Sequence, residues 1–309
     1  MKVNEFKFIN ELVKTLEIKD KDVLVGFGDD CAVVNCGGKK LLFTNDILVE
    51  NRHFIKSKIS GRDLGWKLVS VNVSDVVSSG GFPRWANISI AISKEDIEYI
   101  KDIYLGIKEA LDFYKFSVIG GNTSSSEKLI LDFFLVGETD RYITRDNAKA
   151  GEKVFISDYL GLSRAGLELL LMNKDRYEDF ELKLIKYHTR PVARIDLVNL
   201  LKESASSCID ISDGLAGDLG HISRLSRKRI VIEENKLPIH PLLKMYCEKY
   251  NKNPIDYILY GGEDYQLAFT SSKDIGNCFE IGYIEEGEGV YLKTECGNTK
   301  LKDIGFSHI

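Results

Sequence analysis

The chain lacks the cysteine and histidine patterns of a soft-metal or redox site. It has six cysteines and five histidines among 309 residues. No two cysteines are spaced as Cys-x-x-Cys, and no two histidines as His-x-x-x-His. Zinc sites built from neighbouring residues and redox-active cysteine pairs need spacings of this kind. We therefore expect most cysteines to be small core residues and expect no soft-metal centre.

Long apolar runs and an excess of basic residues are also missing. No uncharged apolar run approaches the roughly 20 residues that a membrane-spanning helix needs. Residues 1–17 alternate apolar and charged side chains, unlike the apolar core of a signal peptide. The net charge of −5 argues against a broad nucleic-acid surface. These features predict a soluble cytoplasmic protein that binds neither nucleic acid nor membrane.

Two well-known phosphate-site signatures are absent as well. There is no G-x-x-x-x-G-K-[ST] loop, and the nearest lysine run, Gly37-Gly38-Lys39-Lys40, is typical of a hairpin turn. The protein-kinase sequences His-Arg-Asp and Asp-Phe-Gly do not occur either. If the chain transfers phosphoryl groups, it must do so on another architecture.

What the sequence does have is an alternation of strand and helix patterns. The first half predicts strands at 23–27, 30–34, 41–46, 86–92 and 129–139, a helix at 62–79, and a helix capped by Ser93. The second half predicts strands at 153–157, 207–212, 265–270, 279–284 and 289–293, with helices after 160 and at 213–226. The segment 140–153 between the halves is polar and aperiodic. The prediction is an α/β fold of two domains, 1–140 and 141–309.

Acidic residues recur beside small residues at the ends of these predicted elements. Small residues let the backbone approach a ligand closely, and carboxylates with hydroxyls and amides are the oxygen ligands that Mg²⁺ prefers. Any one of these positions is also a plausible turn or helix cap. Their recurrence is what favours metal–phosphate chemistry. The positions are Asp29, Asp30, Asp46, Asp75, Asn122, Asp210, Asp213, Glu263 and Asp264.

Taken in order, the motifs around these positions resemble the thiamine-monophosphate kinase family, which shares a fold with aminoimidazole ribonucleotide synthetase. Each motif is weak alone, but their joint order over nearly the whole chain is specific. The motifs are GFGDDCAVV (26–34), TNDILVENRHF (44–54), WKLVSVNVSDVVSSGGFPRW (66–85), VIGGNTSSS (118–126), ITRDNAKAGEKVFIS (143–157), YHTRPVAR (187–194), SCIDISDGLAGDLGHI (207–222), YGGEDYQLAFT (260–270) and GFSHI (305–309).

The resemblance implies a fold, a reaction and partners. It implies a two-domain aminoimidazole ribonucleotide synthetase-like fold whose N-terminal domain pairs in a homodimer and whose C-terminal domain covers the cleft. The implied reaction converts ATP and thiamine monophosphate to ADP and thiamine diphosphate with the help of several Mg²⁺ ions. The acceptor is a phosphate monoester with a second pKa of about 6. It is largely ionised near neutral pH, so no catalytic general base is expected.

The resemblance also implies roles for single residues. The metal ligands would be Asp30, Thr44, Asn45, Asp46, Asp75, Asn122, Asp210 and Asp213, with Asp29 as a further candidate. ATP would contact Gly121, Asn122, Arg145 and Ser212, and the thiamine substrate would contact His53, Glu263 and Phe306. Plainer interpretations stay open: His53 as a strand-end residue, Arg145 as a linker salt bridge, Glu263 as a turn residue and Phe306 as a core cap.

Two departures from the family pattern bear on function. Asn122 stands where the family usually has aspartate, and Asn45 where it usually has a hydroxyl residue. Asparagine keeps an oxygen ligand but removes a charge, so we expect weaker metal binding and retained activity. Two alternatives remain: another ATP-dependent enzyme of the same fold with a different acceptor, or a non-catalytic nucleotide sensor. Asn122 favours the sensor, and the retained aspartates oppose it because clustered carboxylates are costly without a metal.

Overall fold

The structure is a computed structural model that describes residues 8–9, 12–93 and 96–302. Its strands are β1 (Val23–Val25), β2 (Ala32–Cys36), β3 (Lys39–Val49), β4 (Phe82–Ile92), β5 (Ser117–Ser125), β6 (Ile130–Thr139), β7 (Lys153–Ile156), β8 (Ser207–Asp210), β9 (Lys228–Glu233), β10 (Leu267–Ser271), β11 (Phe279–Glu286), β12 (Gly289–Thr294) and β13 (Gly297–Lys300). Its helices are α2 (Gly61–Ser78), α3 (Ile97–Tyr114), α4 (Leu162–Met172), α5 (Asp179–Thr189), α6 (Val198–Ser204), α7 (Leu215–Ser226), α8 (Pro241–Tyr250) and α9 (Pro254–Tyr260), with short 3₁₀ turns η1 (Lys56–Lys58), η3 (Ile195–Leu197) and η4 (Glu234–Lys236).

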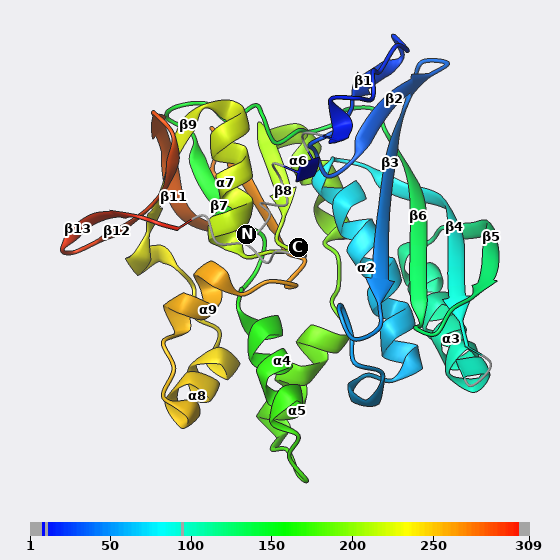
Figure 1. Cartoon of the computed structure of the whole chain (residues 1–309). Coiled ribbons are helices and arrows are strands. Elements are labelled where there is room, and N and C mark those ends of the chain that lie inside the picture. The colour runs from blue at the N-terminus through cyan, green and yellow to red at the C-terminus, as the bar shows by residue number, and fades with distance from the viewer. Residues whose placement is uncertain (1–7, 10–11, 94–95, 303–309) are drawn as a thin grey trace.

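The strands form two sheets, one in each half of the chain (Figure 1). The N-terminal sheet has the order β1-β2-β3-β6-β4-β5, and all its pairs are antiparallel except β4 with β5. The C-terminal sheet has the order β13-β12-β9-β11-β7-β10-β8. The chain changes sheet between Thr139 and Lys153. The α/β class is confirmed. The boundary at residue 140 stays a prediction.

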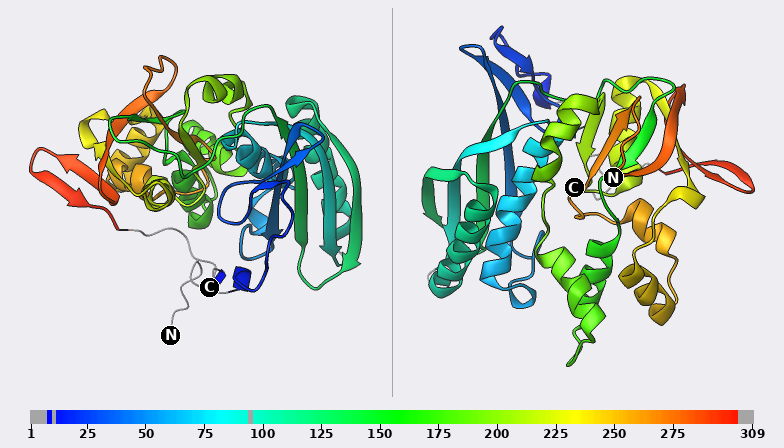
Figure 2. Two further views of the ribbon diagram at one scale, coloured as in Figure 1. Left: turned by 90° about the horizontal axis from the view of Figure 1, so that it is seen from above. Right: turned by 180° about the vertical axis from the view of Figure 1, so that it is seen from behind.

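Helix α2 lies between the two sheets, as views from above and from behind show (Figure 2). One hydrophobic cluster joins its apolar side chains to residues of both halves, including Phe133 of β6 and Phe269 of β10. Nearly every residue of α2 is therefore buried. A helix buried all round needs no polar face, which explains why its sequence is so rich in valine. The helix begins after Ser60, whose hydroxyl accepts a hydrogen bond from the backbone N–H of Asp63 (3.0 Å).

The N-terminal sheet has one covered and one uncovered face. Alternate residues such as Leu131 and Leu135 of β6 pack toward α2 and α3. The residues between them point to the other side, where Phe134 stacks on Phe43 of β3 with ring centroids 6.1 Å apart. Within one chain no described helix covers this second face (Figure 1). Ile47, on the same face, has 47% of its surface exposed.

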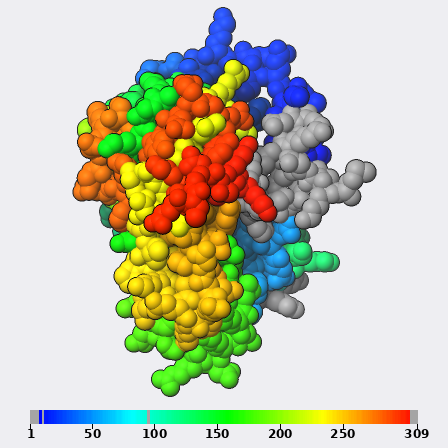
Figure 3. Space-filling view, turned by 90° about the vertical axis from the view of Figure 1, so that its left-hand side faces the viewer, coloured from blue at the N-terminus to red at the C-terminus, as the bar shows by residue number. Residues whose placement is uncertain are grey.

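The C-terminal half packs its helices around the second sheet. A second hydrophobic cluster contains buried residues of α4, α7, α8 and α9, for example Leu169, Leu219 and Tyr246. In the space-filling view the β12–β13 hairpin (red) lies on the surface beside α8 and α9 (yellow to orange) (Figure 3). Among the described residues, no helix is long and apolar enough to cross a membrane.

Some local predictions hold and others need correction. The hairpin turn is confirmed, because Gly37 and Gly38 have positive φ and join β2 to β3. The cap of α3 was placed wrongly: the N-cap is Asp96, and the Ser93 hydroxyl instead donates to the Asp96 carboxylate (2.9 Å). Strands β5, β9 and β13 were not predicted. All six cysteines are free, but only Cys31, Cys208 and Cys247 are buried.

Candidate active site

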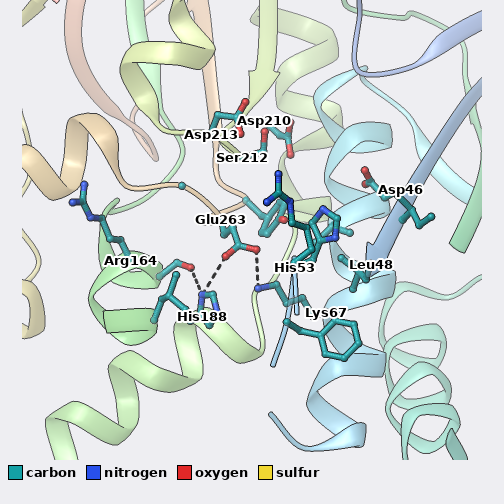
Figure 4. A pocket seen from close by; sticks show the side chains of 18 of the residues that line it. Asp46, Leu48, His53, Lys67, Arg164, His188, Asp210, Ser212, Asp213 and Glu263 are labelled. Carbon is teal, nitrogen blue, oxygen red and sulfur yellow. Dashed lines mark hydrogen bonds and ion pairs between the residues drawn. The ribbon is translucent and has the colours of Figure 1, made fainter. Parts of the chain in front are cut away.

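A cavity of about 1000 Å³ lies between the two halves of the chain. Its walls come from the end of the β1–β2 turn, β3 and the loop after it, α2, α4, and the loops after β8 and α9. Acidic residues line one end of the cavity, and Glu263, Lys67 and His188 line another (Figure 4). Elements far apart in the sequence therefore contribute to a single site.

Three aspartates meet at the acidic end. Asp30, Asp75 and Asp210 each offer a carboxylate oxygen, and these oxygens lie within 4.8 Å of one another. They come from the β1–β2 turn, α2 and the end of β8, so three of the predicted motifs converge. Asp46 and Thr44 of β3 also line the cavity. The predicted clustering of Asp30, Asp46, Asp75 and Asp210 at one site is therefore what the fold produces.

Hydrogen bonds fix the acidic side chains from behind. The Thr44 hydroxyl donates to Asp75 Oδ2 (2.5 Å), which ties β3 to α2. The Ser78 hydroxyl donates to Asp30 Oδ2 (2.6 Å). The backbone N–H of Asp46 donates to the side-chain oxygen of Asn72, one turn before Asp75 on the buried helix (3.1 Å). These three neighbours thus hold the carboxylates of Asp75 and Asp30 and the backbone of Asp46 without adding positive charge.

Burial and mutual repulsion shift the acidity of this group. Burial, with the charge of Asp30 and Asp132, raises the pKa of Asp46 from 3.8 to about 6. Burial and the neighbouring carboxylates also raise the pKa of Asp75 well above its ordinary value. The pKa of Asp210 is raised well above the ordinary value for the same reasons, although Arg145 opposes the shift. Such crowded carboxylates favour a cation or a proton in their midst.

Arg145 is the cation that faces the acidic end. Its guanidinium forms an ion pair with Asp30, and its backbone N–H donates to Asp29 Oδ2 (3.0 Å). Its Nε is buried without a hydrogen-bond partner and lies 3.9 Å from Asp29 Oδ1. Arg145 is therefore a half-buried member of the site that pairs with its carboxylates. Burial and the charge of Asp30 also raise the pKa of Asp29 to about 6.

The loop after β8 is built around an acid that the sequence analysis missed. Asp218 of α7 is buried, and its Oδ2 accepts from the backbone N–H groups of Asp213 (3.2 Å) and Gly214 (3.0 Å). These bonds hold Ser212 and Asp213 at the cavity wall. Asp218 lies one helical turn into DGLAGDLGHI, so a search for acids facing the start of α7 could have found it.

His53 and Glu263 line the cavity as expected. The backbone N–H of Val49 donates to Nδ1 of His53 (3.0 Å), so the neutral ring carries its proton on Nε2. Glu263 has a left-handed backbone conformation (φ 61°), and its N–H donates to the carbonyl of Ser212 (2.7 Å). Glu263 thus closes a turn of the backbone and also lines the cavity. It belongs to a loop anchored on the same segment as the acidic end.

Three of the predicted residues that the structure describes stand apart from this acidic group within one chain, although Asn45 belongs to the cavity lining. The Asn45 side chain lies on the uncovered sheet face and donates to Asp132 Oδ1 (2.9 Å), because neighbours on a strand alternate sides. Its predicted role as a side-chain ligand beside Asp46 is therefore not supported. Gly121 and Asn122 lie on edge strand β5 and do not line the cavity. Strand β5 is the third neighbour of β3 in the sheet, which places it roughly 14 Å from β3. Phe306 lies outside the described residues.

The sequence analysis also missed the residues around Glu263. Lys67 of α2 forms an ion pair with Glu263, and His188 of α5 lies on its other side. Leu167 and Leu171 of α4 add an apolar wall. Lys67 is a lone cation within the apolar run of α2, which is the one signal that could have drawn attention to it.

Comparison with known proteins places this geometry in a family. Residues 28–139 match the family described as AIR synthase related protein, N-terminal domain. The chain is 49% identical to the thiamine-monophosphate kinase of Aquifex aeolicus, over 99% of this chain and 98% of that one. It is 32% identical to the thiamine-monophosphate kinase of Bacillus subtilis, over 99% of each chain.

Solved structures agree with the sequence relatives. The structure described as "AaThiL complexed with AMPPCP and TMP" matches with a TM-score of 0.93 and 47% identity, covering 100% of this chain and 99% of that one. A hydrogenase maturation protein HypE in complex with ATP matches with a TM-score of 0.68 at 16% identity, over 99% of this chain and 93% of that one, which shows a shared fold alone. Full-length identity to named kinases, together with the convergent aspartates, leads to one conclusion: the chain belongs to the thiamine-monophosphate kinase family.

Proposed function

We propose that the chain transfers the γ-phosphoryl group of ATP to thiamine monophosphate and so forms thiamine diphosphate and ADP. The observation that carries the proposal is a single cavity with clustered carboxylates at one end and an apolar, carboxylate-bearing compartment at the other. A phosphate ester of a heterocycle also has two parts: a phosphate, which would lie at the acidic end with the metal, and a ring, which would lie in the apolar compartment. The family relationship supplies the identity of that heterocycle.

The acidic end fits Mg²⁺ as the metal. Its donors are hard carboxylate oxygens within 4.8 Å of one another. Burial and the neighbouring carboxylates raise the pKa of Asp75 and of Asp210, so a cation would relieve their crowded charge. Asp30, Asp46, Asp75 and Asp210 would hold several ions, with Thr44 and Asp213 as additional ligands. When bound, Mg²⁺ neutralises charge on the two phosphate-bearing substrates, which would otherwise repel each other.

The chain's own residues would orient the reactants for a direct transfer. Arg145, with its forked guanidinium and an Nε that makes no hydrogen bond, suits a phosphate oxygen of ATP. Ser212 lies on the wall beside it. An ionised oxygen of the acceptor phosphate attacks the γ-phosphorus, the new P–O bond forms as the β–γ bridge breaks, and ADP leaves with the bond electrons. No side chain needs to remove a proton from the acceptor.

We further propose that the protein acts as a homodimer through the uncovered face of the N-terminal sheet. This face carries Phe43, Ile47 and Phe134 and has no described cover within one chain. Because Gly121 and Asn122 lie at its β5 edge, their expected contacts with ATP and metal would be made in the site of a second copy. Pairing would then complete each site as well as bury apolar surface.

The test separates a kinase from a nucleotide sensor and from an enzyme with another acceptor. Wild-type protein and Asp210→Asn are incubated with ATP, Mg²⁺ and either thiamine monophosphate or free thiamine, and products are separated by chromatography. We expect thiamine diphosphate only from wild-type protein and the monophosphate. ATP binding without product would instead support the sensor, and ATP turnover with a different phosphorylated acceptor would support the other enzyme.

A further inference from the structure

A buried lysine, Lys67, forms an ion pair with Glu263. Lys67 of α2 has 2% of its side chain exposed, and its Nζ lies 3.0 Å from Glu263 Oε1. The Glu263 side chain keeps 30% of its surface exposed and lines the cavity. Lysine is rarely buried so fully without a charged partner. The pair is therefore asymmetric: both residues line the cavity, but the lysine is almost fully buried while the carboxylate keeps exposed surface (Figure 4).

The second support is an uncharged histidine. Nδ1 of His188 on α5 lies 3.5 Å from Glu263 Oε2 and 3.1 Å from the Ser163 hydroxyl. Burial, with the nearby charge of Lys67, lowers the pKa of His188 to about 3. His188 is therefore neutral near pH 7 and adds a polar contact to the carboxylate without adding charge.

The backbone around Glu263 is fixed as firmly as its side chain. A Cβ on Gly262 would lie 2.5 Å from the carbonyl oxygen of Ser212, so only glycine allows this close approach. The next residue, Asp264, accepts from the N–H groups of Gly161 (2.7 Å) and Ser163 (3.0 Å) at the start of α4. Glu263 is thus a preorganised acceptor held by α2, α5 and its own loop.

The charge balance indicates what this acceptor binds. Burial alone would raise the pKa of Glu263, but the charge of Lys67 opposes it, and the pKa lies below its ordinary value. Glu263 is therefore ionised, and with Lys67 it forms a pair of zero net charge. A neutral pair offers little attraction to a cation but still offers a carboxylate oxygen to an N–H donor. The compartment thus suits a neutral amine-bearing ring better than a cationic ring.

We propose that Lys67 is a positioning residue, supported by His188, which holds Glu263 as a hydrogen-bond acceptor for the amino group of the substrate's pyrimidine ring. The inference rests on the proposed function, because that function supplies thiamine monophosphate as the substrate. Its phosphate then lies toward the acidic end and its aminopyrimidine toward Glu263. Lys67 acts only through Glu263 and does not touch the reacting atoms.

The test compares Lys67→Met with a matched control. Lys174 also forms an ion pair with a buried glutamate, Glu181 (2.7 Å), but it does not line the cavity. We expect Lys67→Met to raise the KM for thiamine monophosphate about tenfold or more, equivalent to about 1.4 kcal/mol. The KM for ATP should stay within about twofold of wild type. Lys174→Met should lower thermal stability but leave both KM values near wild type.

A double-mutant cycle shows whether Lys67 acts through Glu263. Lys67→Met should add nothing to the KM of Glu263→Gln, and the double variant should fold even if Lys67→Met does not, because it buries no lone charge. Glu263→Gln should also lose preference for the natural substrate over its analogue with a carbonyl in place of the pyrimidine amine, since an amide can donate to a carbonyl.

The outcomes separate this inference from the function on which it rests. Wild-type KM in a folded Lys67→Met protein, or additive effects in the cycle, would overturn the positioning role while the kinase stands. An unchanged amine preference in Glu263→Gln would overturn the contact with the pyrimidine. Wild-type protein that neither binds nor phosphorylates thiamine monophosphate would remove the proposed function, and this inference with it.

Discussion

Because the clustered aspartates repel one another, we expect a substitution of a buried residue to stabilise the protein, whereas such substitutions usually destabilise it. Replacing Asp75 by asparagine should stabilise the metal-free protein, although the same change should abolish its activity. The carboxylate oxygens of Asp75, Asp30 and Asp210 lie within 4.8 Å of one another. At an effective dielectric constant of about 20, two charges at that distance repel by about 3.5 kcal/mol.

The expected size of the effect is smaller than the full repulsion. Burial and the neighbouring carboxylates already raise the pKa of Asp75, so a proton relieves part of the strain in the wild-type protein. Asparagine keeps an oxygen that can accept from the Thr44 hydroxyl, which donates to Asp75 in the wild type (2.5 Å). We expect a net gain of about 1–3 kcal/mol, or a few degrees in Tm, for Asp75→Asn in a chelating buffer.

Thermal unfolding with and without Mg²⁺ is the assay. Wild-type protein should gain Tm when Mg²⁺ is added, because a ligand that binds the folded state stabilises it, and Asp75→Asn should gain much less. Asp264→Asn is the control, since this buried carboxylate lies outside the cluster and accepts two backbone hydrogen bonds. It should lower Tm in both buffers. A loss of stability for Asp75→Asn in chelator, or an undiminished Mg²⁺ effect, would refute the reasoning.

Three further predictions concern pH, metal affinity and assembly. Burial raises the pKa of Asp29 and Asp46 from 3.8 to about 6, so the folded metal-free protein binds protons more tightly than the unfolded chain does. The stability that these groups contribute is therefore lost as pH rises from about 4 to 6. The increase in Tm on adding Mg²⁺ should accordingly be larger at pH 7.5 than at pH 5.5, and an equal increase would contradict this. Asn122→Asp should lower the Mg²⁺ concentration needed for half-maximal activity, and an unchanged requirement would remove Asn122 from the metal shell. Phe134→Asp places a charge on the uncovered sheet face and should yield monomers of low activity in sedimentation and turnover assays, whereas a stable dimer would move the interface elsewhere.

The acidic end of the site could be predicted because each of its carboxylates lies in a short local motif. A carboxylate beside small residues at an element end is readable without knowing the fold, and the fold then brings Asp30, Asp75 and Asp210 together. The helix α2 was also predicted, although its valine-rich sequence gives a weak pattern. That weakness has a physical reason, since a helix between two sheets needs no polar face.

The support around Glu263 could not be predicted in the same way. Lys67, His188 and Glu263 are separated by more than seventy residues from one to the next, and only tertiary packing shows that they share a site. Asn45 illustrates a different limit. It adjoins Asp46 in sequence, but alternation along β3 sends its side chain to the opposite face, where it binds Asp132.

The position of Asn122 concerns a role that one chain alone would not reveal. Its motif predicts contacts with ATP and metal, yet β5 is the edge strand, and the residue lies outside the cavity. If the proposed pairing is correct, its role depends on a second copy, and no pattern within one sequence marks which residues act across an interface.

Metal-assisted transfer between the two phosphates can be tested by following the labelled γ-phosphate of ATP. Purified protein is given γ-labelled ATP, Mg²⁺ and thiamine monophosphate, with parallel samples that contain free thiamine or a chelator. We expect label in thiamine diphosphate, one ADP formed for each diphosphate, and no transfer to thiamine or in chelator. Label that stays in ATP, or appears only as inorganic phosphate, would contradict metal-assisted transfer between two phosphates in this site.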